Sequence, residues 1–119
     1  MIEFPLWKEG VAECIKELSD PEYQAKAWSG AIPSVFSSYT ELMCRLFDDY
    51  DFEGFIAALR SRKQDALASK LSSLRDKLNW YSNLMPDPVS DQEVLADPRW
   101  HRICTEARAI LPLVQGIDR

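Results

Sequence analysis

The sequence predicts an all-α protein, a single-domain bundle of about five or six helices spanning residues 1–119. Three observations predict this class. Apolar residues recur at spacings of three and four along most of the chain, alternating strand-like runs are absent, and glycines number only four. With 119 residues, of which 46% are hydrophobic, the chain is long enough to bury one core and too apolar for intrinsic disorder. Prolines and capping residues divide it into helices with short connections.

The first helix is expected to end near Ser19. Asp20-Pro21 then starts a second helix, because the Asp carboxylate can accept a free backbone N–H and proline's missing donor costs nothing at the first helical position. This second helix is expected to reach Trp28 and to end at Gly30. The residues expected to face the core from these two helices are Leu6, Trp7, Val11, Cys14, Ile15, Leu18, Tyr23, Ala27 and Trp28.

Residues 31–38 are predicted to form a loop with apolar anchors, followed by a helix that Ser37 or Ser38 can cap, with Glu41 placed for a capping box from Ser38. The run 48–51 favours a turn over a continued helix. A short helix from Phe52 to Leu59 is expected beyond it, weakened by Gly54. The buried stripe of the helix before the turn is expected to hold Tyr39, Leu42, Met43, Leu46 and Phe47.

The most regular pattern predicts a helix over about Ser61 to Leu84. Its apolar residues step by four and three in alternation, which is typical of a helix packed into a bundle: Leu67, Leu71, Leu74, Leu78, Tyr81 and Met85. Lysines repeat every seven residues beside this seam, at Lys63, Lys70 and Lys77. We expect their aliphatic stems to cover the edge of the seam while their ammonium groups stay in water.

Two start signals remain in the last third of the chain. Residues 86–88, Pro-Asp-Pro, end the long helix, and Ser90 is expected to cap a single-turn helix. Asp97-Pro98 then starts the last helix, which is expected to end before Pro112. The inward residues of this helix are expected to be Trp100, Ile103, Cys104, Ala107, Ile110 and Leu111.

Trp80 stands apart from the other three tryptophans, Trp7, Trp28 and Trp100, because it lies beside the seam of the long helix. We expect it in the core, since large aromatic side chains are mostly buried. Partial exposure as an interface anchor is the alternative.

The charge balance is acidic, with 14 Lys and Arg against 19 Asp and Glu and a net charge of −5. This excess disfavours direct binding to nucleic acid or an anionic membrane and suits a basic protein partner. Residues 1–9 have an early acid and no basic region leading into an apolar run, so we do not expect them to act as a secretory signal. No uncharged apolar run approaches the roughly 18 residues of a membrane span. Cys14, Cys44 and Cys104 are odd in number and lie among apolar neighbours, so buried, reduced thiols are expected. We therefore expect a cytoplasmic protein.

Chemistry-bearing motifs are scarce. His101 is the only histidine and has no adjacent acid, so a structural or surface role is expected. Glycine-rich phosphate loops, nucleophile elbows and paired-histidine zinc motifs are absent from the sequence. Arg60, Arg62 and Lys63 form a short basic cluster without the context of a recognition helix. The sequence predicts no enzyme, no metal and no cofactor.

Four acids lie within six residues, at Asp48, Asp49, Asp51 and Glu53, with Tyr50 among them. One interpretation is a solvated turn, and another is an acidic contact surface for a basic partner. A calcium site fits the spacing poorly, because the glycine and the closing glutamate of an EF-hand loop are missing. Paired carboxylates for acid–base catalysis stay open, although no apolar pocket is indicated that would separate their pKa values. We take these five residues as candidate partner-binding residues, with Tyr50 as the aromatic anchor.

Three short segments carry a family resemblance: residues 18–24, Leu-Ser-Asp-Pro-Glu-Tyr-Gln, followed by Trp28; residues 46–49, Leu-Phe-Asp-Asp; and Asp97-Pro98-x-Trp100. Together they resemble a largely uncharacterised family of small helical bacterial proteins. Members of that family occur as immunity proteins of contact-dependent growth inhibition and related polymorphic-toxin systems.

The resemblance implies a cytosolic protein that binds a cognate toxin domain, in many systems a nuclease with a basic substrate surface, and blocks its active site. It supplies no catalytic motif. The alternative is a non-catalytic housekeeping interaction or regulatory protein with an unknown protein partner. Gene order separates the two, because an immunity gene is expected directly downstream of a large secreted toxin gene.

Overall fold

The computed structural model describes residues 3–117 and confirms the predicted all-α class, since 77% of these residues are helical and none lies in a strand. The described residues form seven α-helices and one short π-helix that continues the third of them. Their bounds are α1 (Phe4–Leu18), α2 (Pro21–Trp28), α3 (Tyr39–Cys44), η1 (Arg45–Asp49), α4 (Phe52–Ser61), α5 (Asp65–Leu84), α6 (Asp91–Ala96) and α7 (Pro98–Gln115).

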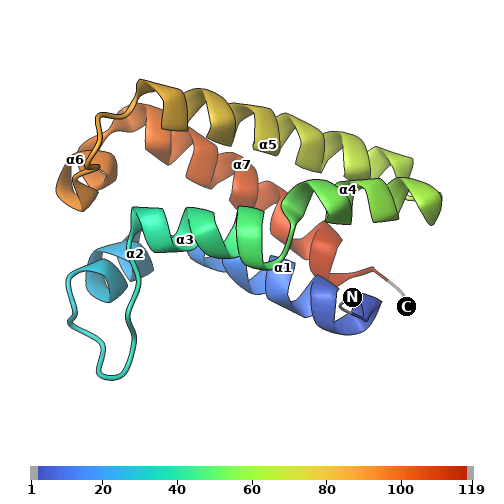
Figure 1. Cartoon of the computed structure of the whole chain (residues 1–119), viewed down its shortest axis with the longest axis horizontal. Coiled ribbons are helices and arrows are strands. Elements are labelled where there is room, and N and C mark those ends of the chain that lie inside the picture. The colour runs from blue at the N-terminus through green and yellow to red at the C-terminus, as the bar shows by residue number, and fades with distance from the viewer. Residues whose placement is uncertain (1–2, 118–119) are drawn as a thin grey trace.

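The three long helices form the body of the molecule. Helix α7 packs against α1 on one side and against the antiparallel α5 on the other (Figure 1). Helix α4 lies along the first half of α5, while α3 and η1 contact α1. The short helices α2 and α6 contact each other and close one end of the bundle, and the loop between α2 and α3 projects from that end (Figure 1).

An aromatic cluster fills the core at the end of the bundle where α2, α3, α5 and α7 meet. It consists of Trp28, Tyr39, Tyr81 and Trp100, whose neighbouring ring centroids lie 5.3 to 6.3 Å apart. Tilted and edge-to-face pairs of this kind contribute about 0.5–1.5 kcal/mol each beyond the burial of their area. The cluster therefore locks four elements together at one point.

The predicted N-caps at Asp20, Ser38, Ser90 and Asp97 are confirmed, whereas the reciprocal half of the capping box, from the Ser38 N–H to the Glu41 side chain, is not formed in the described residues. Asp20 accepts a hydrogen bond from the backbone N–H of Tyr23 at 3.0 Å, and Ser38 accepts one from the backbone N–H of Glu41 at 2.9 Å. The side chains of Ser90 and Asp97 cap α6 and α7 in the same way. Because each cap satisfies a backbone donor that the helix itself leaves free, helices that follow a cap begin where the sequence indicates.

The predicted single helix over 61–84 is wrong at its start. Helix α4 continues to Ser61, Lys63 adopts a left-handed backbone with φ of 63°, and α5 begins at Asp65. Leu59 and Leu67 are both buried on either side of this reversal. Two antiparallel helices that face the same core supply apolar residues on both sides of the turn, so the helical period runs through the turn without a break.

Two other boundaries differ from the expectation. The predicted turn at 48–51 starts later, because the helix of α3 continues as η1 to Asp49. Helix α7 does not end before Pro112 but continues to Gln115. A proline there removes one backbone hydrogen bond and crowds the carbonyl of the preceding turn, whereas continuing the helix buries Val114. The helix passes through Pro112 because the burial of Val114 offsets these costs.

Several expected core positions lie at the surface. Leu6 is 59% exposed and Trp80 is 52% exposed, and Cys44 is exposed although its neighbours at 42 and 46 are buried. Glu17, expected on the outer face of the first helix, is buried with only 8% of its surface exposed. The reason is the same in each case. The width of a buried helix face depends on how many neighbouring helices cover it, and the spacing of apolar residues along the sequence does not show how many do.

Candidate functional site

The four predicted acids fall into two kinds. Asp48 and Asp49 lie on η1 with exposed side chains, and neither forms an ion pair within residues 3–117. Asp51 has a left-handed backbone with φ of 44° and caps α4 by accepting a hydrogen bond from the N–H of Gly54 at 3.1 Å. Glu53 forms an exposed ion pair with Arg75 at 3.4 Å. Asp51 and Glu53 thus already bind groups within the chain, whereas Asp48 and Asp49 form no ion pair in the described residues.

Tyr50 is half-buried. Its ring lies against α1 at Gly10, where any Cβ would overlap the ring atoms. The indole N–H of Trp7 donates a hydrogen bond to the Tyr50 carbonyl oxygen. The ring is therefore held in place by the fold, and only its accessible edge is available for the anchoring role that the sequence predicts.

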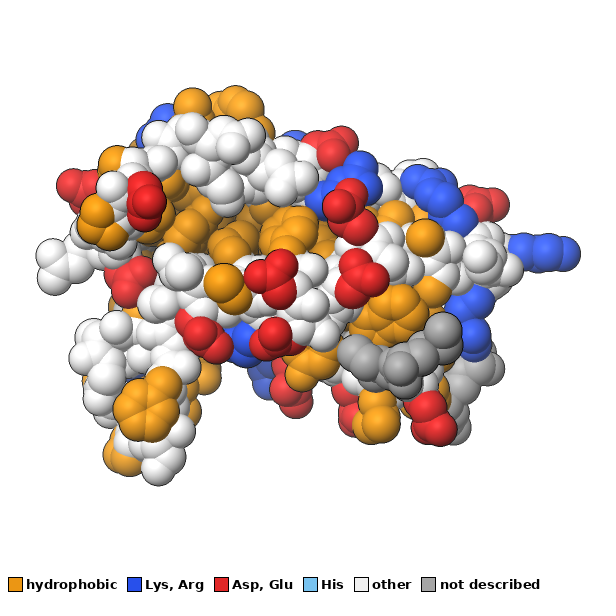
Figure 2. All heavy atoms as spheres, viewed as in Figure 1, with side chains coloured by type: hydrophobic (Ala, Val, Ile, Leu, Met, Phe, Trp, Pro, Cys, Tyr) orange, Lys and Arg blue, Asp and Glu red, His pale blue; other side chains and the backbone are white. Residues whose placement is uncertain are grey.

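The face that carries η1 combines acidic and apolar side chains. Figure 2 shows acidic side chains gathered over α3 and the start of α4, beside an apolar furrow between α3 and α5. Met43 and Phe47 are half-buried and pack against the core from α3 and η1. We name Asp48, Asp49, Asp51 and Glu53 the acidic surface.

The π-helix gives this surface its geometry. The N–H of Tyr50 donates to the carbonyl of Arg45 at 2.9 Å, a bond five residues long where an α-helix has four. The wider turn inserts one residue into the helical register, so Asp48 and Asp49 both stay exposed while Leu46 stays buried. Single turns of π-helix are rare and frequently lie at functional sites.

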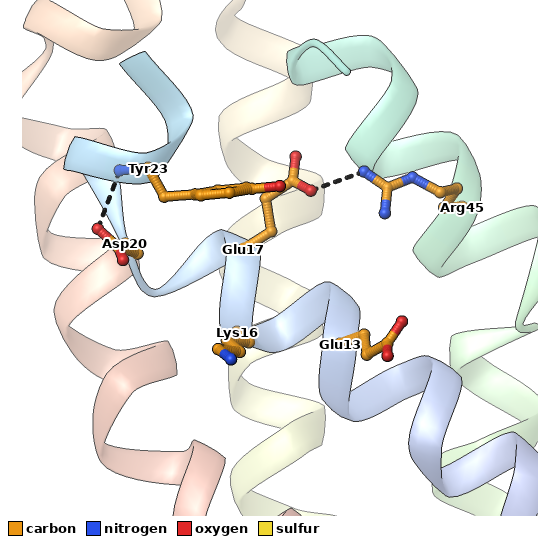
Figure 3. Close-up of a pocket in the computed structure, with 6 residues that line it drawn as sticks. All are labelled: Glu13, Lys16, Glu17, Asp20, Tyr23 and Arg45. Atoms are coloured by element: carbon orange, nitrogen blue, oxygen red, sulfur yellow. Dashed lines mark hydrogen bonds and ion pairs between the residues drawn. The ribbon is translucent and has the colours of Figure 1, made fainter. Parts of the chain in front are cut away.

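The structure contains a second feature that the sequence did not predict, a pocket of about 350 Å³ between α1, α2 and η1. It is lined by Glu13, Lys16, Glu17, Asp20, Tyr23 and Arg45 (Figure 3). Figure 3 shows the Glu17 carboxylate directed toward the Arg45 guanidinium, and the Tyr23 ring lying beside it. The pocket therefore has an ion pair in its wall.

Glu17 is saturated with hydrogen bonds. Its carboxylate accepts from the indole N–H of Trp28 at 3.0 Å, the hydroxyl of Ser37 at 2.6 Å and the guanidinium of Arg45 at 2.8 Å. Burial opposes the ionised form, but these hydrogen bonds outweigh it and hold the pKa of Glu17 below its ordinary value. A carboxylate that is ionised and fully bonded holds elements together and is poorly placed to exchange a proton.

Gln24 is the second buried polar residue on this side of the core. Its amide nitrogen donates to the carbonyls of Glu17 and Leu18 at 2.7 and 3.0 Å, and its amide oxygen accepts from the Trp100 indole at 2.9 Å. These bonds satisfy the open end of α1 and tie it to α7. The sequence holds one indication that Glu17 is buried. It lies three residues after Cys14 and one before Leu18, and this spacing places it at the edge of the inner face of the first helix.

Four further titratable side chains, Cys14, Cys104, His101 and Asp97, are buried or hydrogen-bonded within the fold. Burial raises the pKa of Cys14 to about 12 and that of Cys104 to about 11, so both thiols stay protonated. A ring nitrogen of His101 lies 2.6 Å from the carbonyl oxygen of Leu95, across the junction of α6 and α7. Arg99 holds the pKa of Asp97 down at about 2.

Within residues 3–117, no group of three or more His, Cys, Asp or Glu side chains is arranged to hold a metal ion. No helix in the same part of the chain is both long and apolar enough to cross a bilayer. Comparisons with protein-family models, curated proteins and solved structures find no match to this chain.

Proposed function

We propose that this chain is an immunity protein that binds a cognate toxin domain, with a nuclease as the favoured class, and covers its substrate-binding surface. The observation that carries the proposal is the pair of exposed carboxylates of Asp48 and Asp49, without ion-pair partners in the described chain, beside the half-buried Met43 and Phe47. The resemblance of residues 18–24, 46–49 and 97–100 to immunity proteins supports it.

The acidic surface and the apolar residues have different tasks in this proposal. Carboxylates that face a basic substrate-binding surface accelerate association and disfavour partners of the wrong charge. Apolar contacts that lose their water slow dissociation. Because Asp51 and Glu53 already bind within the chain, Asp48 and Asp49 carry most of the attraction.

Gene order supplies the partner for the test. The C-terminal domain of a large secreted protein encoded directly upstream should be expressed alone and together with this chain. We expect the domain to arrest growth when expressed alone, and to be neutralised and to co-purify when expressed with the chain. A toxin domain that stays active, or a gene without such a neighbour, contradicts the proposal and favours the housekeeping or regulatory alternative.

The acidic surface is tested by D48N/D49N. We expect the toxin affinity to fall about tenfold at low salt, with a weaker dependence on salt, because two unscreened attractions are lost. The matched control is E22Q/E93Q, which removes two exposed carboxylates from α2 and α6. Equal losses in both variants would show that only net charge matters and would remove the acidic surface from the interface.

Asp51 needs its own design, because it caps α4 from a left-handed backbone. Asparagine tolerates that conformation and retains a capping oxygen, so D51N removes the charge while preserving the cap. A loss of toxin affinity in D51N without a change in the free energy of unfolding would therefore report on binding alone.

A further inference from the structure

Helix α5 carries a second stripe besides its buried seam. Lys70, Ser73, Lys77, Trp80 and Leu84 step by three, four, three and four, the same alternation as the seam but turned outward. Trp80 is 52% exposed and Leu84 is 46% exposed. Two large apolar side chains one turn apart on an outward face are typical of a contact region.

Helix α7 is the antiparallel neighbour of α5, so outward residues of α7 lie alongside this stripe. Two hollows lie between them. One, of about 230 Å³, is lined by Lys77, Trp80, Arg99, Arg102 and Ile103, and the other, of about 290 Å³, is lined by Lys70, Ser73, Glu106, Ala109, Ile110 and Leu113. We name these residues together the α5/α7 groove.

The two hollows lie on either side of the ion pair of Lys77 with Glu106, which spans α5 and α7. Leu113, at the far end of the groove from Trp80, is 47% exposed. Trp80 and Ile103 line the hollow on one side of the ion pair, and Ile110 and Leu113 line the hollow on the other, so each hollow has an apolar floor.

The charge of the groove is opposite to that of the molecule. The hollow at Trp80 contains three cationic side chains and no acid, in a chain of net charge −5. Arg99 is turned toward Asp97 at 2.8 Å, whereas Lys70 and Arg102 form no ion pair within residues 3–117. Two cations therefore stand free at the edges of an apolar path.

We propose that the α5/α7 groove binds an acidic amphipathic helix of a protein partner. A groove between two packed helices accepts a third helix whose apolar residues recur at three and four, and the floor of Trp80, Ile103 and Leu113 receives such a stripe. Acidic residues that flank the stripe pair with Lys70 and Arg102. The mostly apolar floor matches a peptide helix and not a phosphate backbone, which needs cations along its whole path.

Glu106 is occupied within the groove. Its Oε1 atom is paired with Lys77, and its Oε2 atom is buried beneath the surface and has no hydrogen-bond partner in the described residues. The acidic residues of the partner helix therefore pair with Lys70 and Arg102. This inference uses none of the residues of the acidic surface and stands independently of the immunity function.

The probe is a fluorescein-labelled peptide of about 15 residues, matched to the roughly 21 Å between positions 70 and 84 of a helix. It carries leucines at helical spacing and flanking glutamates. A second peptide replaces every glutamate by lysine. Fluorescence polarisation with the full chain is expected to show that the acidic peptide binds and that the basic peptide binds about tenfold more weakly or not at all.

Variants locate the binding. K70E/R102E should weaken the acidic peptide about tenfold or more, while the matched reversal K26E/K63E, at two exposed lysines outside the groove, should leave it within about twofold. W80A should weaken it as well, and amide shifts in the NMR spectrum should concentrate on the outward positions of α5 and α7. Circular dichroism checks that each variant is folded. If W80A does not fold, the comparison of the two charge reversals tests the proposal.

Three results would overturn the proposal. Equal binding of the two peptides, or equal losses in the two charge reversals, would show that the groove does not select acidic helices. A dimer in sedimentation velocity that W80A abolishes would assign the groove to a second copy of this chain. Tighter binding of a labelled DNA duplex than of the acidic peptide, lost in K70E/R102E, would assign it to nucleic acid.

Discussion

The pair of Glu17 and Arg45 is the most constrained feature at the scale of single residues. Glu17 bonds Trp28 at one end of the loop between α2 and α3 and Ser37 at the other, so one carboxylate ties both ends of the loop to α1. That loop presents Phe36 with 91% of its surface exposed. A buried ion pair contributes little net stability compared with an apolar replacement, but removing one partner leaves a buried charge uncompensated.

Arg45→Met is therefore expected to destabilise the protein by about 3 kcal/mol, because the Glu17 carboxylate would stay buried without its cation. Urea unfolding followed by circular dichroism measures the change. Lys16→Met is the control, since Lys16 lines the same pocket with an exposed side chain and forms no ion pair in the described chain. A loss in R45M no larger than that in K16M would refute the account of the pair.

At Gly10, the effect of a substitution on stability is expected to be opposite to the effect that helix propensity predicts. Alanine in place of a glycine inside a helix ordinarily stabilises by up to about 1 kcal/mol. At Gly10 the added Cβ would overlap the ring of Tyr50, so Gly10→Ala is expected to destabilise by about 1–3 kcal/mol. In a Tyr50→Ala background the same change is expected to stabilise. Thermal unfolding of the four proteins in this cycle measures the coupling, and a stabilised G10A single variant would show that the ring yields freely.

At the scale of elements, helix boundaries follow the contacts that each end makes. Helices α2, α3, α6 and α7 begin at side-chain caps, and these starts agree with the sequence. The end of α7 follows burial instead, since the helix passes through Pro112 to bury Val114. The strain of that proline is therefore carried by packing around it.

Pro112→Ala is expected to stabilise the protein by about 1–3 kcal/mol. Alanine restores the N–H that can bond the carbonyl of Arg108, and it relieves the clash of the ring with that carbonyl. Position 112 is exposed, so little packing is lost. The midpoint of urea unfolding measures the change. A lower midpoint in P112A would contradict this expectation. It would mean that the rigid ring stabilises the protein, by restricting the unfolded chain, more than it destabilises the helix.

At the scale of the whole molecule, charge is divided between surfaces. The acidic surface on η1 and α4 and the basic α5/α7 groove lie on different elements, apart from the Arg75 contact of Glu53. The net charge of −5 therefore describes neither surface. Overall stability also depends on pH through the few carboxylates whose pKa values the fold lowers, Glu17 and Asp97.

The fold is expected to lose stability as the pH falls into the acid range. A carboxyl with a lowered pKa in the folded state stabilises fully above its unfolded value, which is 4.5 for Glu17 and 3.8 for Asp97. That contribution disappears as the pH falls through the pKa of the carboxyl in the folded state, which is about 2 for Asp97. The difference in free energy of unfolding between the wild type and Glu17→Gln should therefore be constant near neutral pH and shrink below about pH 4.5.

Urea unfolding at a series of pH values measures this difference. Asp65→Asn, at an exposed carboxyl at the start of α5, is the control. A gap between the wild type and E17Q that widens toward acid pH would mean that the pKa of Glu17 is raised, contrary to its hydrogen bonds.

Much of the fold could be predicted because its signals are local. The cap at Asp20, the cap at Asp97 and the seam from Leu67 to Tyr81 each depend on residues within a turn or two of one another. The candidate site was less accessible to prediction. Asp48 and Asp49 could be named from their charge, but the role of Asp51 as a left-handed cap and the seat of Tyr50 on Gly10 depend on other segments.

The sequence by itself determined the helical class, most helix starts and the concentration of acids near residue 50, because periodicity, capping and charge are properties of neighbouring residues. Only the tertiary structure decided that Glu17 is buried against Arg45, that Trp80 is exposed and that α5 begins at Asp65 after the left-handed turn at Lys63. Each of those outcomes depends on which distant helix covers a given face. A local pattern specifies a face, and only the packing of the other elements specifies whether that face meets protein or water.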